Sequence, residues 1–130
     1  MAEISKGAAG EVIAARFLRE QGYDILAVNA RTRLGEVDII AADGQYIAFV
    51  EVKTRGENAI TQSPREAVTR DKQEKIKKAA ASYLQRNHTK LQPRFDVIEV
   101  ITSPSDSPLS AKKVEHIKSA FETGDLHAAF

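Results

Sequence analysis

The chain has 130 residues, of which 42% are apolar, no cysteine and a formal net charge of +1 at pH 7. This length and apolar content predict a single domain over residues 1–130 that can bury its own core. The lack of cysteine excludes disulfides and thiolate metal sites. Because no apolar run reaches the ~18 residues of a membrane span, and the start lacks the apolar core of a signal peptide, we expect a cytoplasmic protein with no membrane partner.

A first helix is predicted from Glu3 to Gln21 by the helical spacing of its small and apolar residues. Ala8 and Val12 belong to the apolar register of this helix. Glu11 falls within a neighbouring inward stripe of small residues, where a carboxylate is costly without a partner. Two interpretations of Glu11 stay open, namely a further metal or water ligand and a paired glutamate at the helix edge.

A β-hairpin over residues 35–53 is predicted to follow a first strand over residues 23–33. Two runs rich in Val, Ile, Phe and Tyr flank Asp43-Gly44, a strong signal for a tight hairpin turn. If the turn is centred on these two residues, Asp38 lies opposite Phe49.

Charged residues stand among the branched apolar residues of this hairpin. In the expected register Glu36 lies opposite Glu51, and Asp38 and Lys53 share their face because side chains alternate along a strand. Crowded carboxylates are destabilising unless a cation or a proton compensates them. Oxygen ligands without nearby cysteine or histidine favour Mg²⁺ or Mn²⁺. Lys53 could then orient or deprotonate a water molecule, or steady charge on a phosphate oxygen. The alternative is a cross-strand ion pair on a solvated sheet face.

These residues resemble the restriction-endonuclease-like superfamily, whose metal site combines an Asp on one strand with Glu-x-Lys on the next. A closer resemblance is to the YraN-like family of small bacterial proteins, which are similar to archaeal Holliday junction resolvases. It covers about Gly7 to Phe121 and rests on Asn29-Ala30-Arg31, Gly35-Glu36-Val37-Asp38-Ile39-Ile40, Phe49-Val50-Glu51-Val52-Lys53-Thr54-Arg55 and Arg94-Phe95-Asp96-Val97.

The resemblance implies roles for individual residues. Asp38 and Glu51 are implied metal ligands, the Val52 carbonyl is a candidate third ligand, and Lys53 is the implied catalytic lysine. Glu36 and Glu11 are expected to help as outer ligands or bases. The superfamily often has Pro before the Asp, where this chain has Val37.

A longer helix is predicted from about Arg70 to Arg86, after a short helical turn that begins near Ser63. Lys72 lies one turn before Ile76 on the inward stripe of this helix. We expect its stem to pack while its ammonium group reaches water, and a place beside the acidic residues is the alternative.

A central strand is predicted from Phe95 to Thr102, because apolar residues occur at both its odd and its even positions and so point to both faces of the sheet. A short final strand is predicted over Val114–Ile117, with a closing turn over Ser119–Glu122. Asp96 is expected to bond the backbone rather than to act in catalysis. The elements together predict an α/β restriction-endonuclease-like core, in the order αβββαβ plus a short C-terminal strand, with a mixed central sheet flanked by helices.

Positive charge is concentrated between Arg65 and Arg94, where nine Lys or Arg stand against three Asp or Glu. A basic segment beside an acidic site suits an enzyme that acts on a polyanion, whereas the alternative is a solvated helix face. Arg33, at the end of the first strand, is either a polar residue at the sheet edge without a binding role or a phosphate contact. The candidate nucleic-acid contacts are Arg31, Arg55, Arg65, Arg70, Lys72, Lys75, Lys77 and Lys78.

The sequence therefore favours a Mg²⁺- or Mn²⁺-dependent nuclease that hydrolyses phosphodiester bonds in DNA rather than RNA. Resolvase similarity implies structured or branched DNA, and a two-fold homodimer would suit the symmetry of a junction. The alternatives are a nucleic-acid-binding module without turnover and a protein-interaction subunit whose basic helix docks an acidic partner.

Overall fold

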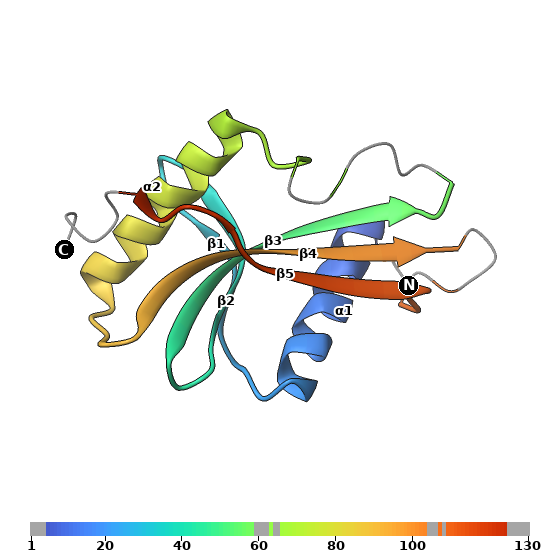
Figure 1. Ribbon diagram of the computed structural model, residues 1–130, viewed down its shortest axis with the longest axis horizontal. Coiled ribbons are helices and arrows are strands. Elements are labelled where there is room, and N and C mark those ends of the chain that lie inside the picture. Colours follow the sequence, from blue (N-terminus) through green and yellow to red (C-terminus); the bar gives the residue numbers. More distant parts are fainter. Residues whose placement is uncertain (1–4, 59–62, 64–65, 104–106, 108, 125–130) are drawn as a thin grey trace.

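Figure 1 shows the computed structural model, which describes residues 5–58, 63, 66–103, 107 and 109–124. The elements are α1 (Lys6–Glu20), β1 (Asp24–Arg31), β2 (Glu36–Ala42), β3 (Tyr46–Gly56), α2 (Arg70–Arg86), β4 (Gln92–Thr102) and β5 (Lys113–Phe121). The strands form one sheet in the order β1-β2-β3-β4-β5, in which β3 and β4 are parallel and the other neighbours are antiparallel. The predicted fold class, a mixed sheet flanked by helices, is confirmed.

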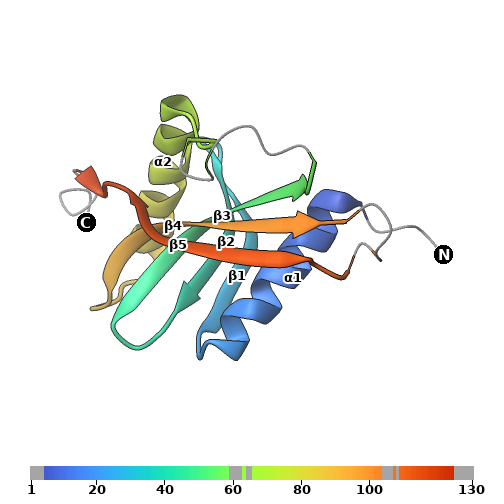
Figure 2. The same cartoon turned by 45° about the vertical axis from the view of Figure 1, so that its right-hand side comes forward.

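The two helices cover opposite faces of the sheet (Figures 1 and 2). On one face, Leu18 of α1 packs in a cluster with Ile39. On the other face, Ile76 of α2 packs in a cluster with Phe49 and Phe95. Since both faces of β4 are covered, this strand is buried along almost its whole length, as predicted.

Both helices begin at a hydroxyl cap. The Ser5 hydroxyl accepts a hydrogen bond from the Ala8 amide at 3.1 Å, and the Thr69 hydroxyl accepts one from the Lys72 amide at 3.2 Å. The predicted bounds of α2 are confirmed, whereas Glu3, the predicted start of the first helix, lies outside the described residues. In the part of the chain that the structure describes, no helix is long and apolar enough to cross a membrane.

The predicted inward register of α1 is wrong at Ala8 and Val12, which are exposed. The physical reason is the close approach of α1 to β3 at Gly10, where an added Cβ would lie 1.9 Å from the Thr54 hydroxyl. This contact turns Ile13 and its neighbours toward the sheet and leaves Val12 in solvent.

The last strand is longer than predicted, and the expected closing turn over Ser119–Glu122 is absent from the described chain. A shift in register between Phe95 and Val97 and a positive φ of 53° at Ser119 mark an irregularity in the pairing of β4 with β5. The strand continues beyond it because the Ser119 amide donates to Asp96 Oδ1 at 3.0 Å and the Phe121 ring stacks on Phe95 at 4.9 Å.

Candidate active site

The turn between β2 and β3 sets the register of the site. It is centred on Gly44-Gln45, one residue later than predicted, because Asp43 Oδ1 accepts hydrogen bonds from the Gln45 and Tyr46 amides at 2.9 and 2.8 Å. Gly44 has a φ of +100°, a backbone conformation that glycine adopts without strain. As a result Ile40 pairs with Phe49.

The predicted pairing of Asp38 with Phe49 is therefore wrong, and so is that of Glu36 with Glu51. A shift of two residues leaves each side chain on its predicted face. It also moves Asp38 from a position diagonal to Glu51 to a position beside it. The Asp38 and Glu51 carboxylates come together from β2 and β3 on the face that α2 covers.

The Asp38 side chain accepts a hydrogen bond from the backbone of β3. The regular pairing of β2 with β3 runs as far as Ile39 and Val50, and the Val52 amide then donates to Asp38 Oδ2 at 2.8 Å. Burial raises the pKa of Asp38 to about 7, and the negative charge of Glu51 adds to this rise, while the hydrogen bond from Val52 opposes it. At neutral pH the Asp38 carboxyl group is therefore partly protonated.

Two lysines lie beside the carboxylate pair. Lys72 Nζ, from the first turn of α2, is 2.6 Å from Glu51 Oε1, and Lys53 Nζ is 3.7 Å from the same oxygen. The expectation that the Lys72 ammonium group reaches only water is wrong, because Glu51 has just 5% of its side chain exposed and draws the cation to it.

The two lysines differ in their protonation. Burial lowers the pKa of Lys53, and the neighbouring Lys72 lowers it further. Burial also acts to lower the pKa of Lys72, but the hydrogen bond to Glu51, the contact with Lys53 and the negative charges of the two carboxylates together raise it. Lys72 is thus the fixed cation of the pair, and Lys53 is the lysine that gives up its proton more readily.

A small pocket opens over these groups. Its volume is about 240 Å³, and we call it the acidic cleft; it is lined by Glu36, Asp38, Glu51, Lys72, Lys75 and Ile76. Glu36 lies at its rim, where its carboxylate is 3.1 Å from Arg31 Nε. Glu11, on α1, does not line the cleft, although its charge contributes to the raised pKa of Asp38.

The donor set fits a divalent cation of the Mg²⁺ or Mn²⁺ type. The buried Glu51 and the partly buried Asp38 bring two carboxylates together, and the raised pKa of Asp38 shows that its negative charge is unfavourable there. Among the described residues, no three Asp, Glu or His side chains gather as a metal site. Protein ligation would therefore rest on Asp38, Glu51 and a backbone oxygen, for which the Val52 carbonyl is the candidate.

Most of the candidate nucleic-acid contacts are paired within the chain. Apart from Lys72, the ion pairs are Arg31 with Glu36, Arg55 with Glu99, Lys75 with Asp71 and Lys77 with Glu74. Arg70 and Lys78 are exposed on α2, and Arg65 lies outside the described residues. The pair of Arg55 with Glu99 is largely buried, since 12% and 3% of these two side chains are exposed. The exposed pairs on α2 are weak and can open to a polyanion.

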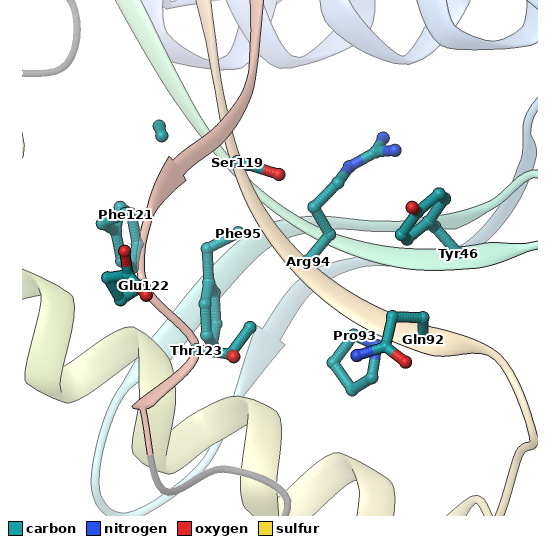
Figure 3. Close-up of a pocket in the computed structure, with 10 residues that line it drawn as sticks. Tyr46, Gln92, Pro93, Arg94, Phe95, Ser119, Phe121, Glu122 and Thr123 are labelled. Atoms are coloured by element: carbon teal, nitrogen blue, oxygen red, sulfur yellow. The ribbon is translucent and has the colours of Figure 1, made fainter.

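A second polar cluster lies near the beginnings of β3 and β4. Buried Asp96 accepts hydrogen bonds from Arg94 Nη2 at 2.9 Å and from the Ser119 amide, and His116 Nε2 lies 2.8 Å from Asp96 Oδ2. Burial acts to raise the pKa of Asp96, but the bonds to His116 and Arg94 lower it overall. Figure 3 shows the Arg94 side chain extending toward Tyr46, whose ring centre is 4.8 Å away. Because these charges are matched and buried, the cluster has a structural role, with Asp96 bonding side chains as well as the expected backbone.

The chain is similar to known proteins over most of its length. The profile of uncharacterised protein family UPF0102 matches residues 10–100. A UPF0102 protein of Clostridium botulinum strain Loch Maree is 48% identical over 118 residues, which cover 89% of this chain and 93% of that protein. A UPF0102 protein of Chlorobaculum tepidum is 47% identical over 121 residues, which cover 92% of this chain and 93% of that protein. The chain therefore belongs to the UPF0102 family, which is the YraN family.

Proposed function

We propose that this protein is a metal-dependent phosphodiesterase that acts on DNA. The observation that carries the proposal is the pair of carboxylates from Asp38 and Glu51, which meet in a cleft beside two lysines. Burying two carboxylates together is costly, and the pKa of Asp38 rises to about 7 as a result. Strongly perturbed groups gathered in a cleft are typical of functional sites.

Several residues in and beside the acidic cleft have proposed tasks. Asp38, Glu51 and the Val52 carbonyl would hold Mg²⁺ or Mn²⁺, which supplies Lewis acidity and neutralises charge on a phosphate oxygen when bound. Lys53, whose pKa is lowered by burial, would orient the attacking water and accept its proton. Glu36, at the rim of the cleft, would act as an outer base.

The proposed substrate is a DNA backbone, and its preferred form is structured or branched DNA through the similarity to resolvases. Lys75 borders the acidic cleft, and Lys78 extends the basic character of α2 beyond it. These lysines would attract phosphates while the carboxylates are compensated by the ion. A two-fold homodimer is proposed because it would match the symmetry of a four-way junction.

A panel of linear, flapped and four-way DNA, incubated with Mg²⁺ or Mn²⁺, tests the proposal. We expect cleavage that EDTA abolishes. Lys53→Met should reduce the rate by about 10²-fold or more, since a positioned acid or base contributes about 10²–10⁴, and DNA affinity should remain. Lys113→Met removes an exposed lysine at the start of β5 and is the matched control. The enzyme proposal fails if the wild-type protein cleaves none of these substrates with either ion.

A nucleic-acid-binding module without turnover is the second candidate function. It is favoured by the contact of 2.6 Å between Lys72 Nζ and Glu51 Oε1, because this ion pair neutralises Glu51 without any metal. Metal-independent binding of DNA without cleavage, with affinity unchanged in Lys53→Met, would support this candidate.

A further inference from the structure

A basic pocket lies beside the turn that joins β1 to β2, apart from the acidic cleft. Its volume is about 460 Å³, and it is lined by Thr32, Arg33, Leu34, Ser82 and Arg86. Among the described residues, no carboxylate lines it. Arg33 and Arg86 are exposed, and neither forms an ion pair with any residue that the structure describes. These two guanidinium groups are thus available to an anion, unlike most of the cations around the acidic cleft.

The turn that carries Arg33 is held in one conformation. The Thr32 amide donates to the Gly35 carbonyl at 2.8 Å, and the Thr32 hydroxyl accepts from the Leu34 and Gly35 amides at 3.1 Å each. The turn also packs directly on α2, since a Cβ added at Gly35 would lie 2.2 Å from the Lys75 carbonyl oxygen. Arg33 is therefore placed beside α2 before any ligand arrives, which reduces the entropy lost on binding.

The same turn borders the acidic cleft. Glu36 follows Gly35 directly and lines that cleft together with Lys75. Along α2, Arg86 lies eleven residues beyond Lys75, or about 16 Å at a rise of 1.5 Å per residue. This separation exceeds the spacing of neighbouring phosphates on one DNA strand, so a phosphate held beside Arg86 is a different one from a phosphate in the acidic cleft.

We propose that Arg33 and Arg86 form a second phosphate site, which binds the DNA backbone at a different phosphate from the one in the acidic cleft. This inference rests on the proposed function and names where its substrate is held. Guanidinium groups bind phosphate oxygens through paired hydrogen bonds, and the hydroxyl of Ser82 offers a further donor. The C-terminal end of α2 carries about half a negative charge, which the two guanidinium charges exceed.

Fluorescence anisotropy with a labelled DNA duplex, measured in EDTA at several salt concentrations, tests this site. The variant is Arg33→Gln/Arg86→Gln, and the matched control is Arg16→Gln/Arg19→Gln, which removes two exposed arginines from α1 on the opposite face. We expect the variant to weaken binding and to flatten the slope of log K against log salt by about 0.9 for each lost phosphate contact. The control should keep the wild-type slope. If the double variant unfolds, Arg86→Gln alone should flatten the slope by a smaller amount.

Two further binding measurements distinguish a DNA backbone from free phosphate as the ligand. Duplexes too short to contact both sites at once should distinguish the wild-type protein from the double variant less than longer duplexes do. Sodium phosphate should show no saturable binding that depends on Arg86. A slope equal to that of the control variant, or saturable binding of free phosphate with no change in DNA affinity, would overturn the inference. Because EDTA prevents metal-dependent cleavage, failure here leaves the proposed activity untouched, and an absence of cleavage leaves this binding test valid.

Discussion

Replacing Asp38 with asparagine should stabilise the metal-free protein at neutral and alkaline pH. Burial, and then the charge of Glu51, raises the pKa of Asp38 from 3.8 to about 7 on folding. A carboxyl group whose pKa is higher in the folded state contributes stability that is fully present below pH 3.8 and is lost as the pH rises through about 7. The amide of the asparagine would stay neutral at every pH, and its oxygen could still accept the hydrogen bond from the Val52 amide.

The size of the effect follows from the shift in the pKa of Asp38. A rise of about three pKa units corresponds to a ceiling of about 4 kcal/mol in the free energy of unfolding, at about 1.36 kcal/mol per unit. The Asp38 carboxyl group is only partly buried and the cleft is open to water, so we expect the actual effect to be smaller. We therefore expect Asp38→Asn to be about 1–3 kcal/mol more stable than the wild-type protein at pH 8, and about a third of that more stable at pH 5.

Urea unfolding in EDTA between pH 5 and pH 8 measures this difference. Asp24→Asn, at the exposed start of β1, is the control and should unfold like the wild-type protein throughout. Added Mn²⁺ should stabilise the wild-type protein at pH 8 and leave Asp38→Asn unchanged. A variant that is less stable than the wild-type protein at pH 8, or whose stability difference is the same at pH 5 and pH 8, would refute this electrostatic explanation.

Three other substitutions have defined outcomes. Lys72→Met should raise the affinity for Mn²⁺ about two- to fivefold in calorimetry, because the free energy of a partly exposed ion pair, about 0.5–1 kcal/mol, no longer competes with the ion. Gly35→Ala should lower the free energy of unfolding by about 1–3 kcal/mol in urea, because its new Cβ would collide with the Lys75 carbonyl oxygen. Arg94→Leu should cost about 3–5 kcal/mol in the same assay, because it leaves buried Asp96 without its guanidinium partner.

The first two substitutions have control variants, and the third has a result that would contradict it. Lys75→Met removes another cation of the acidic cleft, and an equal gain in Mn²⁺ affinity there would mean that net charge, not the contact with Glu51, sets the effect. Gly7→Ala on α1 meets open space and should be neutral or stabilise by up to about 1 kcal/mol. Loss of less than about 1 kcal/mol in Arg94→Leu would contradict a structural role for its buried ion pair.

The sequence predicts which side chains of the hairpin share one face of the sheet, but not which residues lie opposite one another. Alternation along a strand fixes which side chains of the hairpin share a face, so Asp38, Glu51 and Lys53 could be grouped from the sequence alone. The register depends on which residues form the turn, and a side-chain hydrogen bond decides this. The dipeptide Asp43-Gly44 signals a turn, but the Asp43 carboxylate caps the turn instead of occupying its centre.

Contacts between distant elements could not be predicted. The periodicity of α2 places Lys72 on the inward stripe, but it does not tell how near the first turn of the helix comes to Glu51. Likewise, Gly10 allows α1 to approach β3 closely, and this approach rotates the buried stripe away from Val12. The pocket shared by Arg33 and Arg86 depends on how the β1–β2 turn packs on α2, and no short-range pattern encodes that contact.

Calorimetric titration of Mn²⁺ into the metal-free protein tests most directly whether Asp38 and Glu51 hold a divalent ion. The wild-type protein should bind about one ion per chain in a saturable manner, because two hard carboxylates and a backbone oxygen suit Mn²⁺. Glu51→Gln and Asp38→Asn should each abolish this binding, and the exposed Asp24→Asn should keep it. Absence of saturable binding to the wild-type protein, or equal binding to all three variants, would contradict the proposed metal site.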